Sequence, residues 1–279
     1  MNKIRPIKAS AIALFLIVVF VAVKYPLRKD NGVLDLTLLV TPVLFSIFVA
    51  FSISERLSRV DRIRENDSNE RSSLILIDTI SSLLPIDKHH HIKKLIDEYL
   101  MATMDYKMSD YQLTYINYRK LAEYLLKLQN IESERDREFH QLVEKMLSAR
   151  EQTVSLISDK LSKFEWLVYT VLAIGVVLPF LIVNSGTFLS VLLISILSAS
   201  VLVILFFLYK LDSINWKRSI RIIEPYQKTF EVMGLKRYFP EALLSDKYIR
   251  RLTGNDYRVG HFANPYPDLS DKKIEYVQK

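Results

Sequence analysis

The feature that most constrains this chain is the scarcity of residues that turn or stop a helix. From Val33 to Ile174 the sequence contains no glycine and only two prolines, Pro42 and Pro85. Glycine and proline are the residues that most often punctuate local structure. A stretch of this length without them predicts a small number of long helices.

Charge divides this helical stretch into three parts. No charged residue occurs in 36–54 or in 166–209, whereas 18 basic and 20 acidic side chains fall in 55–165. An uncharged run of about 20 residues is long enough to cross a bilayer as a helix. We therefore predict an all-α membrane protein in which a long-helix cytoplasmic bundle, residues 55–165, connects two transmembrane hairpins.

Four spans are predicted, and the first resembles a signal peptide because a basic start precedes a short apolar run. A signal peptide needs small residues at its cleavage site, and cutting after Ala22 would place Phe20 at a position where a small residue is required. A retained span is the preferred interpretation. The predicted hairpin 1–54 contains spans at about 9–24 and 34–54, and the predicted hairpin 166–209 contains spans at about 166–183 and 188–209.

The distribution of positive charge predicts the topology. Residues 1–35 carry a net charge of +4 and the tail, residues 210–279, carries +5, while the polar turn Asn184–Thr187 carries no charge. Lys and Arg collect on the cytoplasmic side of membrane proteins. We therefore place both termini, the 55–165 block and the tail in the cytoplasm, with the spans in the lipid bilayer of the cell (inner) membrane. Topology explains the basic charge, so no nucleic-acid partner is predicted.

The sequence does not carry the motifs of a catalytic, cofactor or metal site. It has no cysteine, no glycine-rich phosphate loop, no GxSxG and no HExxH. His89, His90 and His91 are consecutive, so on a helix they point in three directions and do not converge on one ion. We predict that the protein is not an enzyme and has no cofactor and no bound metal.

One face of the second predicted span combines hydroxyl, aromatic and basic residues at helical spacing. Such a face suits a pore, with a basic mouth at its cytoplasmic end, and it equally suits ordinary packing between helices. The candidate pore-lining residues are Thr41, Phe45, Phe48, Ser52, Arg56 and Arg59.

A basic residue interrupts an apolar seam in the cytoplasmic block. Arg150 lies between Met146 and Val154, on the face that should pack against other helices. A buried guanidinium needs a partner, because an unpaired buried charge is strongly unfavourable. Asp78 is the candidate for a structural ion pair with it; the alternative is that Arg150 reaches solvent at the edge of the seam.

Two segments leave alternatives open. Residues 64–73 contain no apolar side chain, so the helix there is either fully solvated or interrupted near Asp67. The tail is rich in aromatic residues, which argues against a disordered segment. We expect it to lie against the helical block or against a neighbouring subunit.

The arrangement of two spans, a helical block and two further spans resembles the bestrophin-like membrane proteins of bacteria over about residues 33–210. Short local matches accompany it: Phe51-Ser52 closes the second span, Ala149-Arg150 precedes the third span, and Glu165-Trp166 opens it. Characterised bestrophins are pentameric ion channels, mostly anion-selective, whose pore is lined by the second span and narrowed by apolar residues. The resemblance would place Phe45 and Phe48 at a constriction. The acidic calcium clasp of the animal members is not found.

These observations support two functions. The first is an oligomeric, bestrophin-like ion channel that conducts anions such as chloride, with a pore lined by the second span. The resemblance implies a homo-pentamer. The alternative is a non-enzymatic, membrane-anchored scaffold or signalling subunit that acts through its cytoplasmic helical block.

Overall fold

The computed structural model forms two compact units. The first contains the chain up to residue 59 together with 160–213, and the second contains 60–159 together with 214–279. The predicted span at 9–24 lies outside the described residues, which are 32–128, 134–214, 220–245, 247–254 and 256–278.

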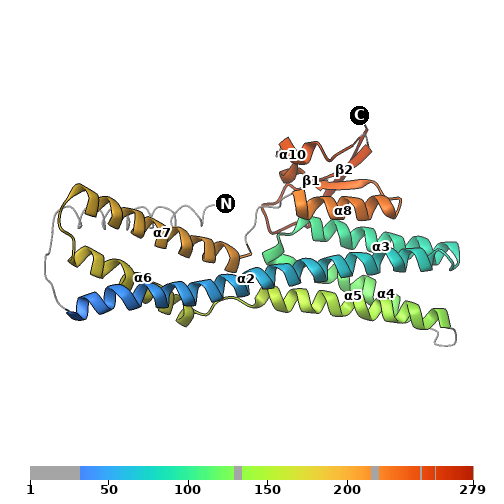
Figure 1. Cartoon of the computed structure of the whole chain (residues 1–279). Coiled ribbons are helices and arrows are strands. Elements are labelled where there is room, and N and C mark those ends of the chain that lie inside the picture. The colour runs from blue at the N-terminus through green and yellow to red at the C-terminus, as the bar shows by residue number, and fades with distance from the viewer. Residues whose placement is uncertain (1–31, 129–133, 215–219, 246, 255, 279) are drawn as a thin grey trace. The chain divides into compact units, whose positions relative to one another are not determined.

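Within the described residues, the first unit consists of three apolar helices. They are the first part of α2 (Gly32–Ser81), α6 (Lys163–Ile182) and α7 (Phe188–Asp212), and in the described chain these three helices are long and apolar enough to cross a membrane (Figure 1). They coincide with the spans predicted at 34–54, 166–183 and 188–209. The fourth predicted span is the one outside the described residues.

Local capping fixes where the helices of this unit begin. The Ser162 hydroxyl accepts a hydrogen bond from the backbone N–H of Glu165 at 3.2 Å, and the Glu165 carboxylate accepts one from the N–H of Ser162 at 2.6 Å. This reciprocal capping box satisfies two N–H groups that the first turn of α6 would leave unpaired. Thr187 caps α7 in a similar way, through the N–H of Ser190 at 3.3 Å.

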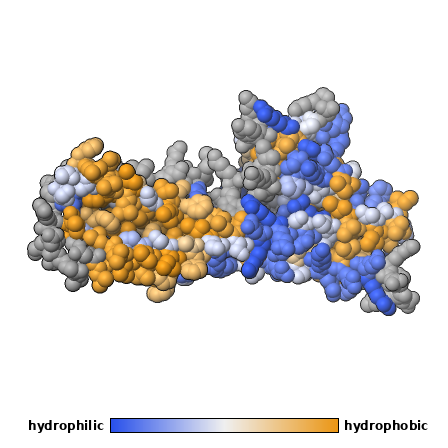
Figure 2. All heavy atoms as spheres, in the orientation of Figure 1, coloured by the Kyte–Doolittle hydropathy of each residue, from blue (hydrophilic) through white to orange (hydrophobic). Residues whose placement is uncertain are grey.

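The core of the first unit is formed where α2, α6 and α7 meet. At Gly175 of α6 an added Cβ would lie only 2.8 Å from the Thr41 methyl, so glycine permits the close approach of α2 and α6. Figure 2 shows that the surface of this unit is largely hydrophobic, as lipid contact requires. Its buried apolar side chains are Phe45, Val49, Leu161, Tyr169, Ala173, Val176, Val201 and Leu208.

The second unit is a helical bundle with a small sheet. Its helices are the remainder of α2, α3 (Ile86–Asp105), the 3₁₀ helix η1 (Met108–Thr114), α4 (Tyr115–Lys127) and α5 (Glu134–Ser158). The helical prediction for this block is confirmed. The largest apolar core among the described residues lies here, and its fully buried members include Leu74, Ile77, Ile92, Ile96, Leu100, Leu121, Val143 and Met146.

The polar stretch 64–73 does not interrupt α2. The helix continues through Asp67, and Glu70 and Ser73 are both buried although the stretch has no apolar side chain. Glu70 lies seven residues from each of the buried residues Ile63 and Ile77, which is a heptad interval, so it faces the interior of the bundle. The stretch is therefore neither broken nor fully solvated.

The tail contains strands, so the all-α prediction is wrong for this part of a mostly helical chain. After α8 (Ile220–Val232), the short elements β1 (Arg237–Pro240), α9 (Glu241–Leu244) and α10 (Lys247–Arg250) precede β2 (Asp256–His261) and β3 (Lys273–Gln278). The sheet order is β1-β2-β3, with β1 parallel to β2 in a register that pairs Tyr238 with Arg258, and β2 antiparallel to β3. Consecutive residues are buried in β1 and β2, so these strands lack the apolar and polar alternation that marks a half-buried strand in a sequence.

The tail packs against the helical block, as expected, because α8 and β1 both lie on α3. Tyr238 and Phe239 of β1 are fully buried. The Tyr238 hydroxyl donates to the Asp105 carboxylate at 2.6 Å, and a Cβ added at Gly260 would overlap that hydroxyl. Arg258 of β2 donates two hydrogen bonds to the Asp97 carboxylate of α3, at 2.6 and 2.7 Å.

Candidate functional site

The polar and aromatic face of the second span is turned toward the helices of its own subunit. Phe45 is 4% exposed, and Ser52, Arg56 and Arg59 are also buried. The Ser52 hydroxyl contacts the Tyr169 hydroxyl of α6 and donates to the Phe48 carbonyl at 3.0 Å. A side chain covered by its own subunit cannot project into a pore shared between subunits.

The two arginines of this face converge on the end of α7. Each places Nη1 3.8 Å from Oδ1 of Asp212, and Arg59 also donates to the Asp212 carbonyl at 3.2 Å. The same Oδ1 accepts the backbone N–H of Leu161 at 2.8 Å, and Arg56 makes a second ion pair with Glu55 at 3.2 Å. The two arginines therefore link the middle of α2 to the C-terminal end of α7, and their buried side chains do not form an open basic mouth.

Most of the candidate pore-lining set is thus buried within the subunit. Thr41 packs near Gly175, while Phe45, Ser52, Arg56 and Arg59 are buried inside the subunit, and only Phe48 of the six is exposed, at 49%. Sequence reasoning missed Asp212. Its signal was available, because Asp212 is the first acidic residue after the 44-residue uncharged run.

A different, wholly apolar stripe of the second span remains exposed. Val40, Leu44 and Phe48 follow one another at four-residue intervals, which places them on one side of a helix. Phe51 extends the exposed surface by one turn and is 74% exposed. We call Val40, Leu44 and Phe48 the apolar stripe.

The second unit contains a buried polar network around Arg150. This residue is 1% exposed, and its Nη1 and Nη2 donate to the Tyr99 hydroxyl at 2.6 Å and to the Thr114 hydroxyl at 2.9 Å. The Tyr99 hydroxyl donates in turn to Glu70, and Tyr111 donates to the other Glu70 oxygen at 2.6 Å. The network links α2, α3, η1 and α5.

Aromatic rings enclose the guanidinium group. Its central carbon lies 4.2 Å from the ring centroid of Tyr118, 4.6 Å from that of Tyr111 and 5.4 Å from that of Tyr99. Cation–π attraction is strongest where water is excluded. We call the set Glu70, Tyr99, Tyr111, Thr114, Tyr118 and Arg150 the arginine network.

Burial controls the proton affinities in this network. Desolvation raises the pKa of Glu70 from 4.5 to about 7, although hydrogen bonds from Tyr111 and Tyr99 and the charge of Arg150 act to lower that pKa. Burial raises the pKa of Tyr99 and of Tyr111 well above 10. Glu70 is therefore the group of this network that titrates near neutral pH.

The predicted ion pair between Asp78 and Arg150 is not formed. Arg150 is buried on the seam, as one alternative required, but its hydrogen bonds go to Tyr99 and Thr114. Asp78 instead lies 4.0 Å from Nδ1 of His89, and burial raises its pKa. The heptad interval between Ile63, Glu70 and Ile77 was the sequence signal that could have identified Glu70.

The three consecutive histidines have separate surroundings. Nδ1 of His89 lies 2.9 Å from the Ser81 hydroxyl, and the His91 ring stacks on Tyr124 with centroids 4.4 Å apart. Among the described residues, no three His, Cys, Asp or Glu side chains are grouped so that they could hold a metal ion.

Comparison with known proteins identifies the family. The profile of the Bestrophin-like domain matches residues 7–213. A solved bacterial Bestrophin homolog from Klebsiella pneumoniae is 10% identical with a TM-score of 0.62, over 81% of this chain and 98% of that chain. A point variant of that homolog is 11% identical with a TM-score of 0.61, again over 81% of this chain and 98% of that chain. At this identity the likeness shows the fold alone, and no curated protein matches the sequence. Because the family profile matches about three quarters of its length, this chain belongs to the bestrophin-like family of membrane proteins.

Proposed function

We propose that this protein is the subunit of an oligomeric ion channel in the cell (inner) membrane, and that the channel conducts chloride or another small anion. Its pore is lined by the second span, through the apolar stripe and not through the buried face of α2. The termini that flank the spans, the second unit and the tail lie in the cytoplasm, in keeping with the distribution of positive charge.

The observation that carries this proposal is the exposed stripe of Val40, Leu44 and Phe48. The same helix buries Phe45 and Val49 against α6 and α7, so the stripe belongs to the exposed side of α2 that is available to other copies of the chain. Several copies around one axis would bring their stripes together into apolar rings. Such rings constrict a path and control its hydration.

Oligomerisation follows from the size of one subunit. The described spans of a single chain pack closely around their own apolar core. A pore therefore needs several subunits, and the family resemblance favours five.

The buried arginines cannot select anions, because they are paired with Asp212. Arg62 of α2 is exposed and follows Leu44 by 18 residues, which is five turns of an α-helix, so both project from the same side of α2. In an oligomer, a ring of Arg62 side chains would attract anions.

The test combines subunit counting with flux measurements. The purified protein should be an oligomer of three or more chains by native mass spectrometry and should conduct chloride in bilayers. Phe48→Ala should raise the conductance because it widens an apolar ring. Phe45→Ala is the matched control: it should lower thermal stability and leave the conductance of intact channels unchanged.

Arg62→Glu should shift the reversal potential in a salt gradient toward cation permeation. If the protein is a monomer or dimer, or conducts nothing in any form, the channel proposal is wrong and the membrane-anchored scaffold takes its place. If it conducts but Phe48→Ala has no effect, the stripe does not line the pore.

A further inference from the structure

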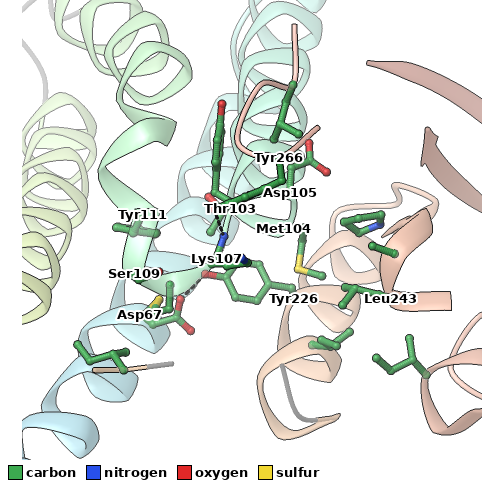
Figure 3. A pocket seen from close by; sticks show the side chains of 18 of the residues that line it. Asp67, Thr103, Met104, Asp105, Lys107, Ser109, Tyr111, Tyr226, Leu243 and Tyr266 are labelled. Carbon is green, nitrogen blue, oxygen red and sulfur yellow. Dashed lines mark hydrogen bonds between the residues drawn. The ribbon is translucent and has the colours of Figure 1, made fainter. Parts of the chain in front are cut away.

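The second unit contains a pocket that neither the predicted pore nor the family match explains. It has a volume of about 880 Å³ and lies between α2, the end of α3, α8 and the tail (Figure 3). Pockets that bind small molecules measure roughly 300–1,000 Å³. The pocket is therefore large enough for a small organic ligand.

Most of the wall is apolar and comes from distant parts of the sequence. Residues of α2 and α3 form one side, and residues of the tail form the other, so the pocket depends on the docking of the tail. Side chains that supply the apolar wall include Ile63, Met104, Met108, Ile223, Leu243 and Phe262. A wall of this kind binds an apolar body by removing it from water.

The carboxylates of the wall are already neutralised by donors. Asp67 accepts hydrogen bonds from the Tyr226 hydroxyl and from Nε of Arg71, the latter at 3.2 Å. Asp105 forms an ion pair with Lys272 at 2.7 Å. The third wall carboxylate, Glu241, pairs with His261 at 2.9 Å.

Two cations of the wall, Lys107 and Arg71, in contrast have donors to spare. Among the described residues, the ammonium group of Lys107 has neither a carboxylate nor a hydrogen-bond acceptor, and it lies 4.3 Å from the Tyr266 ring centroid. Arg71 uses only Nε in its contact with Asp67, which leaves its terminal nitrogens without a hydrogen bond inside the described chain. A surplus of positively charged donors beside an apolar wall is complementary to an anion with an apolar body.

We propose that this pocket binds a small organic anion. Its acidic group is held at Lys107, and its apolar body, about the size of an aromatic group, lies between α8 and the tail segments that follow α8. The inference is independent of the proposed channel function, because binding can be measured directly. Tyr111 lines the pocket and also donates to Glu70 in the arginine network. A bound ligand therefore contacts a residue on which the packing of the second unit depends.

The tail borders the pocket on the side of Lys107. The backbone N–H of Lys107 donates to the Tyr266 hydroxyl at 3.2 Å, and that hydroxyl donates to Asp110. These contacts position the segment that follows β2 across the end of α3. This gives the tail, which lies beyond the family match, a role in ligand binding.

The experiment uses full-length protein in lipid nanodiscs and isothermal titration calorimetry. Three probes share one apolar body: biphenyl-4-acetate, its neutral amide, and the cation biphenyl-4-methylamine. We expect saturable binding of the acid about tenfold or more tighter than that of the amide, as a charge-assisted contact predicts. The amine should give no saturable heat, and empty nanodiscs correct for partition into lipid.

Two variants separate the charge from the wall. Lys107→Met should remove the preference for the acid over the amide, whereas Lys120→Met, at an exposed lysine outside the pocket, should keep it. Leu243→Trp should fill the pocket and abolish binding of both the acid and the amide. If the Leu243→Trp protein aggregates in size-exclusion chromatography, Met108→Trp is used in its place. The proposal is overturned if wild-type protein binds acid and amide equally, if it gives no more heat than empty nanodiscs, or if Lys107→Met keeps the preference.

Discussion

Replacing Arg150 with methionine should destabilise the second unit, and the loss should depend on pH. Methionine can fill much of the same apolar space, so the change chiefly removes the guanidinium group. That group donates to Tyr99 and Thr114 and lies among three tyrosine rings. Its removal also takes away a positive charge that favours the ionised form of the buried Glu70.

The magnitude follows from these contacts. Two charge-assisted hydrogen bonds contribute about 1.5–3 kcal/mol each, offset in part by the desolvation of Arg150 that is no longer required. The carboxylate of Glu70, 3% exposed, also loses the charge of Arg150, which favours its ionised form. We expect a loss on the order of 3 kcal/mol at pH 8.

The pH dependence has a definite sign. The pKa of Glu70 is about 7 in the wild-type fold, and removal of Arg150 should raise it further. At pH 5 Glu70 is neutral in both proteins, so removing the charge of Arg150 costs nothing through Glu70 there. The loss should therefore be clearly smaller at pH 5 than at pH 8.

Hydrogen exchange of the full-length protein in detergent, read by mass spectrometry, gives local opening free energies for α3 and α5. A double-mutant cycle between Arg150→Met and Glu70→Gln should show coupling above about 1 kcal/mol, and a cycle with Asp78→Asn should show almost none. Equal losses at pH 5 and pH 8, or a larger coupling to Asp78 than to Glu70, would refute the arginine network as described.

Three further predictions concern single groups. Glu70→Gln should flatten the pH dependence of stability. Because the pKa of Glu70 is raised in the fold, its contribution to stability is complete below pH 4.5 and is lost as the pH rises through 7, by about 3 kcal/mol in total. An unchanged slope of stability against pH in the variant, measured by thermal melting, would contradict this. Asp212→Asn should lower the stability of the first unit by roughly 3 kcal/mol, because two buried arginines lose their shared carboxylate; exchange rates in α7 that match wild type would count against this pairing. Gly260→Ala should cost about 1–3 kcal/mol by displacing the Tyr238 hydroxyl from Asp105, and the cost should shrink in a Tyr238→Phe background; equal costs in both would show that this clash is not the cause.

The helices were predictable because their signals are local. The absence of glycine and proline between Val33 and Ile174 and the two uncharged runs identify helical segments without knowledge of their partners. The burial of Arg150 was also predictable, because its neighbours on the seam are apolar at helical spacing. Its partners were not, since Glu70 and Tyr99 come from helices 80 and 51 residues away in the sequence.

The face of the second span shows why the candidate site was harder to predict. Periodicity groups Phe45, Ser52 and Arg56 on one side of α2, but it does not say whether that side meets its own subunit or a neighbour. Only the tertiary contacts with Tyr169 and Asp212 decide this. A span with a polar face that is followed by arginines is typical of a pore-lining helix. It is equally typical of a helix that packs against others in its own subunit.

The tail shows that the match to the family and the folded unit have different boundaries. The family profile ends at residue 213, yet Phe230 of α8 and Tyr238 of β1 are fully buried in the same core as Ile96 of α3. The Gln227 side chain accepts from the backbone N–H of Tyr238 at 3.0 Å and donates to its carbonyl at 2.8 Å, so it serves the free edge of β1 as a neighbouring strand would. A chain that ended at residue 213 would expose the apolar face of α3 and lose one wall of the pocket. The tail is therefore part of the second unit, and a truncation there alters the fold of that unit before it reports on conduction or binding.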